Sequence, residues 1–303
     1  PKIHKVNIPL RPVLSANAMY NFKLAKELVP ILMPLCKNEF TVNDTFSFVN
    51  EICNRHFNAA PIMASIDVEN LFTNIPIAEV IEIIIEKLFD RPDITVVGLK
   101  KSDFRTLLEK SVRSSHFIFN NLIYRQIDGV AMGNPLGPIF ANIFLSHHEK
   151  SWLKDCPIEF KPSLYRRYVD DSFLLFDEIS MVQKFLDYLN VQHRNMTFTF
   201  ELESNNSLPF LGVGVTKTED SFTTGIYRKP TFSGLFMNFQ SCMPNCYKLG
   251  LLKTLLHRAS LHICSTHPIF NQELLNVKKF QRLNGFGMSI IDSTINNFLW
   301  RKN

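Results

Sequence analysis

The sequence lacks the features of membrane proteins and of small secreted proteins. It contains no run of about 18 apolar residues, the length that a helix needs to cross a bilayer, and its most apolar segment, residues 77–89, is interrupted by three glutamates. Its six cysteines are scattered, unlike those of a disulfide framework. A signal peptide, internal repeats and low-complexity tracts are also missing. These absences favour a globular chain, and 303 residues are enough for two or three subdomains around sizeable cores.

The chain is basic, with a net charge of +5 and a pI of about 8.8, and the excess lies at its two ends. The first 26 residues contain five lysines or arginines and no acid, and the segment from Lys248 onward contains eight against two acids. Basic ends around a more acidic middle predict that the protein binds a polyanion from two sides. An ordinary solvated surface has the same composition, so this interpretation stays open. Within the second segment we predict that Lys278, Lys279 and Arg282 contact nucleic acid.

Two adjacent carboxylates, Asp170 and Asp171, lie between two apolar, β-prone runs in residues 164–176. This pattern predicts a β-hairpin with both acids at its tip. Adjacent like charges repel unless they are solvated or bridged by cations, and Mg²⁺ prefers oxygen ligands of this kind. An Asp-Asp pair is also ordinary turn chemistry, so this segment alone leaves both interpretations open.

Two segments earlier in the chain favour the metal interpretation. Residues 62–68 are predicted to form a buried strand that ends near Asp67, and Phe72 follows five residues later. Residues 129–138, G-V-A-M-G-N-P-L-G-P, predict a loop whose glycines let the backbone approach a ligand closely; a structural turn is the alternative. Two metal ions about 4 Å apart, held by carboxylates from neighbouring strands, are what in-line phosphoryl transfer uses. The three motifs in this order therefore predict such a site.

The remaining elements follow from apolar periodicity and turn residues. We predict helices at residues 17–35, 43–57, 77 onward, 101–114, 139–148, 179–189 and from 247 to the end, with a break at 284–287. We predict strands at residues 116–126 (a pair turning at Asn120-Asn121), 196–202, 208–215 and 221–227.

Together these motifs resemble reverse transcriptases, most closely those of Penelope-like retroelements. The segments that carry the resemblance are P-K-I-H-K…L-R-P-V-L-S, S-I-D-V-E-N-L-F-T-N-I-P, G-V-A-M-G-N-P-L-G-P-I-F-A-N-I-F, R-Y-V-D-D-S-F, F-T-F-E…L-P-F-L, Y-R-K-P-T-F-S-G and V-K-K-F-Q-R-L-N-G-F-G-M-S-I-I-D. They extend over nearly the whole chain. Gly212 departs from the family, which commonly has Asp there, and no segment resembles the GIY-YIG endonuclease that often accompanies these proteins.

The resemblance implies specific roles for individual residues. Asp67, Asp170 and Asp171 match the catalytic, metal-binding acids, with the Val68 carbonyl as a further ligand. Phe72 matches the aromatic gate beneath the sugar of the incoming nucleotide. Lys2 and Arg11 match basic residues that bind the triphosphate. Met132 and Gly133 match the loop beside the nascent base pair.

The implied fold is α+β, a right-hand polymerase with fingers, an antiparallel palm sheet backed by helices, and a helical thumb. The implied domains are the fingers at 1–60, a first part of the palm at 61–90, a fingers insertion at 91–126, a second part of the palm at 127–228, and the thumb with C-terminal helices at 229–303.

The implied function is RNA-directed DNA polymerase activity, in which a primer 3′-hydroxyl attacks the α-phosphate of a dNTP with two Mg²⁺ ions, for which Mn²⁺ can substitute. The implied partners are an RNA template, a DNA primer and dNTPs, and neither a membrane nor a protein partner is indicated. Because the chain begins at Pro1 rather than Met, we expect a fragment of a longer protein. The alternative is therefore a catalytically incomplete, nucleic-acid-binding fragment of such an element, although the three intact acids favour the enzyme.

One further pattern, Cys242-x₃-Cys246 followed by His257-x₄-His262, resembles the ligand order of zinc fingers. Its middle gap of ten residues is shorter than the usual gap of about twelve, and both histidines fall within an apolar helical pattern. We therefore expect no zinc at these residues.

Overall fold

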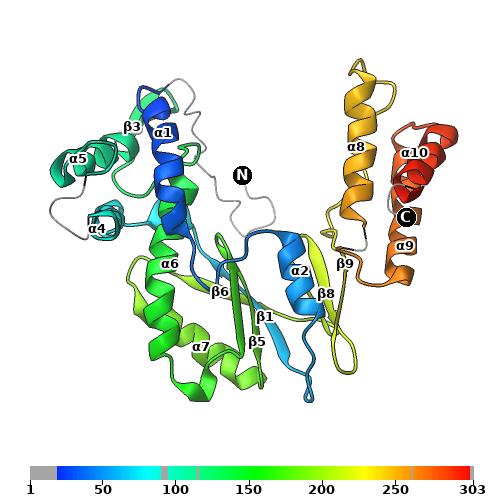
Figure 1. Cartoon of the computed structure of the whole chain (residues 1–303), viewed down its shortest axis with the longest axis horizontal. Helices are drawn as coiled ribbons and strands as arrows, with labels where there is room; N and C mark the ends of the chain where they lie inside the picture. Colours follow the sequence, from blue (N-terminus) through cyan, green and yellow to red (C-terminus); the bar gives the residue numbers. More distant parts are fainter. Residues whose placement is uncertain (1–18, 90–94, 114–115, 261, 301–303) are drawn as a thin grey trace. The chain divides into compact units, whose positions relative to one another are not determined.

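The computed structural model of the protein describes residues 19–89, 95–113, 116–260 and 262–300. Lys2 and Arg11, the predicted triphosphate-binding residues, lie outside the described residues. Helices and antiparallel strand pairs alternate along the chain (Figure 1), which confirms the α+β class. The chain divides into two compact units, the first comprising the chain up to Thr41 and Ile66–Glu201, the second Val42–Ser65 and the chain from Leu202 onward. No helix in the described part of the chain is long and apolar enough to cross a membrane.

The first unit is built on a four-stranded sheet with the strand order β4-β5-β1-β6. Its strands are β1 (Ile62–Val68), which begins in the second unit, β4 (Leu164–Tyr168), β5 (Asp171–Phe176) and β6 (Phe198–Leu202). In β1 the buried residues Met63, Ala64 and Ile66 are followed by Asp67, which is exposed. The predicted strand and its terminal acid are therefore confirmed.

The helices of this unit follow the chain order that the periodicity predicts, with the short helix α3 in addition. They are α1 (Phe22–Leu32), α3 (Leu71–Asn74), α4 (Ile77–Leu88), α5 (Lys101–Val112), α6 (Gly137–Asp155) and α7 (Ile179–Gln192), with 3₁₀ turns η1 (Met33–Cys36) and η2 (Ile158–Phe160). The isoleucine face of α4 is buried, and α4 packs against α5 and α6. Helix α6 extends past the predicted residues 139–148, because Trp152 and Leu153 continue its buried face.

The predicted turn at Asn120-Asn121 joins β2 (His116–Phe119) to β3 (Leu122–Arg125). Both asparagines have positive φ, 50° and 60°, as a two-residue hairpin turn requires. Asparagine tolerates this left-handed backbone better than most residues, which explains why the pattern could be recognised from sequence.

The second unit combines a three-stranded antiparallel sheet, in the order β7-β8-β9, with helices. Its elements are α2 (Thr45–Cys53), β7 (Ser207–Phe210), β8 (Val213–Lys217), β9 (Phe222–Ile226), α8 (Asn245–Arg258), α9 (His267–Leu283) and α10 (Met288–Trp300). The predicted strand at 208–215 is wrong in one respect, because it is two strands joined by a turn. Leu211 and Gly212 take φ values of 51° and 74°, which fold the segment back on itself.

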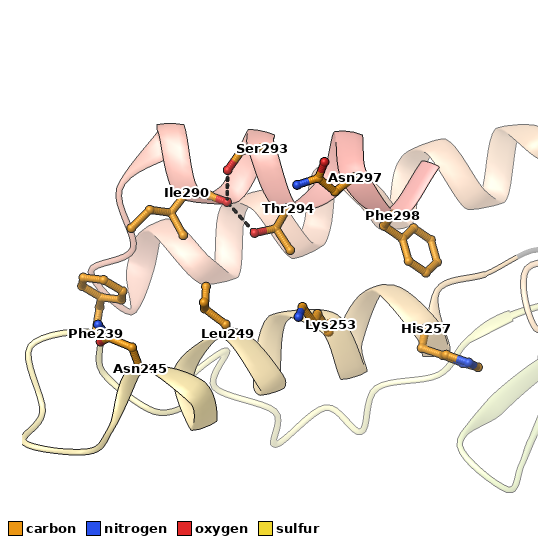
Figure 2. Close-up of a pocket in the computed structure, with 10 residues that line it drawn as sticks. All are labelled: Phe239, Asn245, Leu249, Lys253, His257, Ile290, Ser293, Thr294, Asn297 and Phe298. Carbon is orange, nitrogen blue, oxygen red and sulfur yellow. Dashed lines mark hydrogen bonds between the residues drawn. The ribbon is translucent and has the colours of Figure 1, made fainter. Parts of the chain in front are cut away.

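A buried cluster unites the three C-terminal helices. Leu252 and Leu256 of α8 contact Val277 of α9 and Ile291 and Ile295 of α10, and each of these side chains is almost fully buried. Between α8 and α10 lies a groove of about 550 Å³, whose lining residues are shown in Figure 2. The predicted break between the last two helices is confirmed. The helical segment predicted from residue 247 is wrong in one respect, because α8 ends at Arg258 and α9 begins only at His267.

Candidate active site

The end of β1 and the tip of the β4–β5 hairpin lie together. The backbone N–H of Val68 donates to the backbone oxygen of Asp170 at 3.2 Å, and β1 and β5 are neighbours in the sheet. Asp67 and Asp171 are exposed, and Asp170 is half-buried. The structure thus places Asp67 next to the Asp170-Asp171 pair, which lies more than 100 residues later in the sequence.

The hairpin tip has an unfavourable backbone conformation. Tyr168 and Asp171 are the last paired residues of β4 and β5, so Val169 and Asp170 form a two-residue turn. Val169 has a φ of 58°, which is a genuine outlier for a β-branched residue. Such strain persists only where the surroundings over-determine the conformation, and it is concentrated at functional sites.

Arg167 supplies that constraint from behind the tip. Its side chain is fully buried, and its Nη1 donates to the carbonyl oxygen of Val169 at 3.0 Å. The same nitrogen donates to Oδ1 of Asn142 at 2.8 Å, and Nη2 donates to Oγ of Ser146 at 3.0 Å, both on α6. The Nε atom pairs with the carboxylate of Glu149, also on α6. The turn is therefore tied to the longest helix of its unit.

Glu149 is 1% exposed, so its charge needs more than one partner. Besides Arg167 it accepts hydrogen bonds from the Tyr165 hydroxyl at 2.9 Å and from Nδ2 of Asn38 at 2.9 Å. Burial, and next the Glu149 charge, hold the pKa of Tyr165 far above its ordinary value, so the phenol stays protonated and donates. The network is invisible in the sequence, because its members come from three separate segments: Asn38, helix α6 and the β4 hairpin.

The glycine-rich loop contacts the turn that carries Phe72. Val130 N donates to the backbone oxygen of Phe72 at 2.7 Å. Gly129 has a φ of +72°, and a Cβ there would lie 2.4 Å from the Thr73 carbonyl oxygen. Phe72 is half-buried. The loop therefore depends on glycine at this position for both conformation and space.

Two other residues of this loop were predicted to bind nucleotide. Met132 is half-buried and Gly133 is exposed with a φ of 119°. Both belong to the loop that contacts the Phe72 turn, so the structure places them in the same unit as the acids. The sequence analysis missed Asp128, whose Oδ1 accepts from the backbone nitrogens of Ile77 at 3.2 Å and Gly129 at 2.9 Å. Asp128 thus joins the first turn of α4 to the loop.

The donor set at the tip of the sheet fits a hard divalent cation. The side chains of Asp67, Asp170 and Asp171 and the carbonyl group of Val68 offer oxygen only, and two of the three carboxylates are exposed. Mg²⁺ and Mn²⁺ take such ligands together with water and phosphate oxygens. These four residues are the ones that would hold such ions.

The predicted nucleic-acid-binding residues of the second unit line one surface hollow. Lys278, Lys279 and Arg282 surround it together with Phe232 and Phe280, and its volume is about 790 Å³. Lys279 and Arg282 are exposed. Lys278 is half-buried and its Nζ lies 2.7 Å from Oδ1 of Asp292, so part of its charge is already neutralised.

The zinc-finger-like residues lie in the same unit. Cys242 and Cys246 are exposed, and His257 and His262 face the Phe46 ring edge-on. In the part of the chain that the structure describes, these four residues do not form a metal-ligand group.

The solved structures with a similar fold include two telomerases and a viral RNA polymerase. Telomerase from Candida albicans, in complex with a fragment of telomeric RNA, has a TM-score of 0.58 and 12% identity over 91% of this chain and 51% of its own. Telomerase from Candida tropicalis has a TM-score of 0.53 and 13% identity over 93% and 48%. The RNA-dependent RNA polymerase of bacteriophage phi12 has a TM-score of 0.50 and 12% identity over 90% and 44%. The α+β polymerase fold is thereby confirmed, and the chain spans about half the length of these proteins.

One family model, described as an animal helix-turn-helix domain, matches residues 235–296. The match takes in all of α8 and α9 and most of α10, about a fifth of the chain. The search of curated proteins found no match.

The Gly129 contact predicts a difference between two glycines with similar backbones. Gly98 has a φ of +73° and open space around its Cα, whereas a Cβ at Gly129 meets the Thr73 backbone. Gly98→Ala should cost about 1–2 kcal/mol from backbone strain alone. Gly129→Ala should cost more, roughly 2–5 kcal/mol, because overpacking adds to the strain. Urea unfolding measures both, and equal midpoints would show that the loop does not press on the Phe72 turn.

Proposed function

We propose that the protein is an RNA-directed DNA polymerase of the reverse transcriptase kind, and that it comes from a Penelope-like retroelement. The hydrogen bond from Val68 to Asp170 carries this proposal, since it joins the two segments that bear the acids at adjacent strand ends. The fold shared with two telomerases and a viral RNA polymerase supports it. The sequence motifs are the reason for proposing a Penelope-like retroelement in particular.

In this proposal Asp67, Asp170 and Asp171, with the Val68 carbonyl, hold two divalent cations. When bound, such ions neutralise the phosphate charge and activate the primer 3′-hydroxyl for in-line attack on the dNTP. The buried network of Arg167 keeps the hairpin tip in place while the charges at the tip change. Phe72 lies under the sugar of the incoming nucleotide, and Met132 and Gly133 border the base pair that forms.

The domain assignment is part of the same proposal. The fingers occupy residues 1–60 and 91–126, the palm 61–90 and 127–228, and the thumb 229–303. Lys2 and Arg11 are proposed to meet the triphosphate. Lys278, Lys279 and Arg282 are proposed to grip the primer–template duplex, and the match to a helix-turn-helix family supports a duplex contact by these helices. The competing proposal is a fragment that binds nucleic acid without catalysis. The primer-extension test described next distinguishes the two proposals.

Removing one acid should abolish synthesis and spare nucleic-acid binding. Asp67→Asn and Asp170→Asn each remove a charge that holds a cation, so the rate of primer extension on an RNA template should fall by about 1,000-fold or more. Asp177→Asn makes the same chemical change at an exposed residue just past the opposite end of β5 and should leave the rate unchanged. If the wild-type protein does not extend a primer, the non-catalytic alternative is correct.

Phe72→Ala should change the choice of sugar. A ring under the nucleotide closes the space that a ribose 2′-hydroxyl needs, so its loss should admit ribonucleotides while deoxynucleotide incorporation stays measurable. If Phe72 only packs in the core, Phe72→Ala should instead destabilise the protein by roughly 3–5 kcal/mol and lower the incorporation of both nucleotide types together. The ratio of kcat/KM for a deoxynucleotide and its ribonucleotide gives the answer, and an unchanged ratio in a folded variant contradicts the gate.

The hollow at Lys278, Lys279 and Arg282 should contribute to binding through charge alone. The triple change to Gln should weaken binding to all sequences alike and reduce the slope of log K against log salt by roughly 2, because Lys278 is already paired with Asp292. The control changes three exposed lysines of the first unit: Lys154, Lys161 and Lys184. Fluorescence anisotropy with a labelled RNA–DNA hybrid measures the slope, and equal slopes in wild type and triple variant refute the contact.

A further inference from the structure

Three side chains far apart in the sequence meet on the first unit. Glu79 lies in the first turn of α4, His148 on α6, and His193 just after α7. Nε2 of His148 lies 2.8 Å from Oε1 of Glu79, and Nε2 of His193 lies 3.1 Å from Oε2 of the same carboxylate. One ligand atom from each residue lies within 4.8 Å of the other two. None of these residues takes part in the proposed polymerase chemistry.

The two imidazole rings are held in place by aromatic neighbours. The His148 ring stacks on Trp152, with centroids 5.3 Å apart and an interplanar angle of 16°. His193 meets the Phe144 ring edge-on at 5.0 Å. Both nitrogen atoms therefore point at the carboxylate without further loss of side-chain freedom, which is the preorganisation that a binding site needs.

We propose that Glu79, His148 and His193 bind one zinc ion. Zinc takes imidazole nitrogen at about 2.0–2.1 Å and carboxylate oxygen at about 2.0–2.2 Å, which separates tetrahedral ligands by roughly 3.4 Å. The two nitrogens lie 2.8 and 3.1 Å from different oxygens of the Glu79 carboxylate, and the three ligand atoms lie within 4.8 Å of one another, so side-chain rotations bring them to this separation. Two nitrogens with one carboxylate also suit zinc better than Mg²⁺, which prefers oxygen.

Metal binding exchanges the hydrogen bonds of the two rings. Burial lowers the pKa of His148, which favours the neutral ring that binds metal, despite the opposing effect of Glu79. In each histidine the proton now shared with the carboxylate moves from Nε2 to Nδ1 when the metal takes its place. His193 then gives up the 3.2 Å bond that its Nδ1 accepts from the Asn195 backbone. The two histidine–carboxylate hydrogen bonds and this longer one are thus exchanged for three metal–ligand bonds.

The exposure of the three side chains leaves an entry path and a fourth position. Glu79 is 36% exposed, His148 19% and His193 14%. A water molecule can complete the tetrahedron from the open side. Zinc bound here ties α4 to α6 and to the end of α7, the helices of the unit that carries the three acids. We therefore assign it a stabilising role that is separate from the cations at Asp67 and Asp170.

The test is zinc binding by the full chain, measured by chelator competition and by metal content after gel filtration. The wild-type protein should bind one zinc ion, and zinc should raise its Tm. Glu79→Gln, His148→Gln and His193→Gln should each weaken binding by about 100-fold or more, beyond the loss expected for a residue that only orients a ligand. His147→Gln, at an exposed neighbour that is not in the cluster, should bind as the wild type does.

Two results would overturn the site. Stoichiometric zinc binding that survives unchanged in all three variants places the metal elsewhere, and a wild-type protein without saturable binding has no zinc site. The wild-type measurement is decisive even if a variant fails to fold. Cobalt gives an independent readout, since Co²⁺ at this site should produce visible d–d absorption that zinc abolishes and excess Mg²⁺ does not. Asp67→Asn should keep zinc binding intact, which separates this site from the polymerase proposal.

Discussion

A buried ion pair between Arg167 and Glu149 is the interaction on which the candidate active site depends. A valine at positive φ is unfavourable, and the tip at Val169 keeps this conformation because the guanidinium donates to its carbonyl oxygen. Removing one member of a buried pair costs roughly 3–5 kcal/mol, since the other charge is left unpaired. The pair therefore couples the position of Asp170 to helix α6. We interpret the network as a rigid support for a turn whose acids must not move apart.

The second constraint comes from the contact between the glycine-rich loop and the turn after β1. Gly129 approaches Thr73 so closely that no side chain fits, and the loop backbone bonds to that of Phe72. Asp128 adds a link to the start of α4. Both ends of the segment from Asp67 to α4 are thus held, one by the sheet and the other by the loop. Phe72 lies between these two held ends.

Local patterns predicted where Asp67, Asp170 and Asp171 lie in the fold, because each lies where a strand ends or turns. The apolar run of β1, the β-prone runs around Asp170 and the Asn120-Asn121 turn are all short-range features. The β7–β8 turn was missed because Leu211 takes a left-handed backbone that leucine seldom adopts.

The contacts between distant segments could not be predicted. Arg167 reads as one more residue of a strand, and Glu149 as a charge on a helix. The cluster of Glu79, His148 and His193 could not be predicted for the same reason, since the histidines lie 69 and 114 residues after Glu79 in the chain. Only the packing of α4, α6 and α7 brings them together. Tertiary structure therefore determines the supporting residues, whereas the sequence pattern is enough to indicate the acids.

The account is tested most directly by locating the metal ions in the working complex. The measurement is anomalous diffraction from crystals of the protein with an RNA template, a DNA primer, a matching dNTP and Mn²⁺. We expect manganese peaks between the carboxylates of Asp67 and Asp170, next to the triphosphate. A bound nucleotide without manganese at these carboxylates would contradict the account.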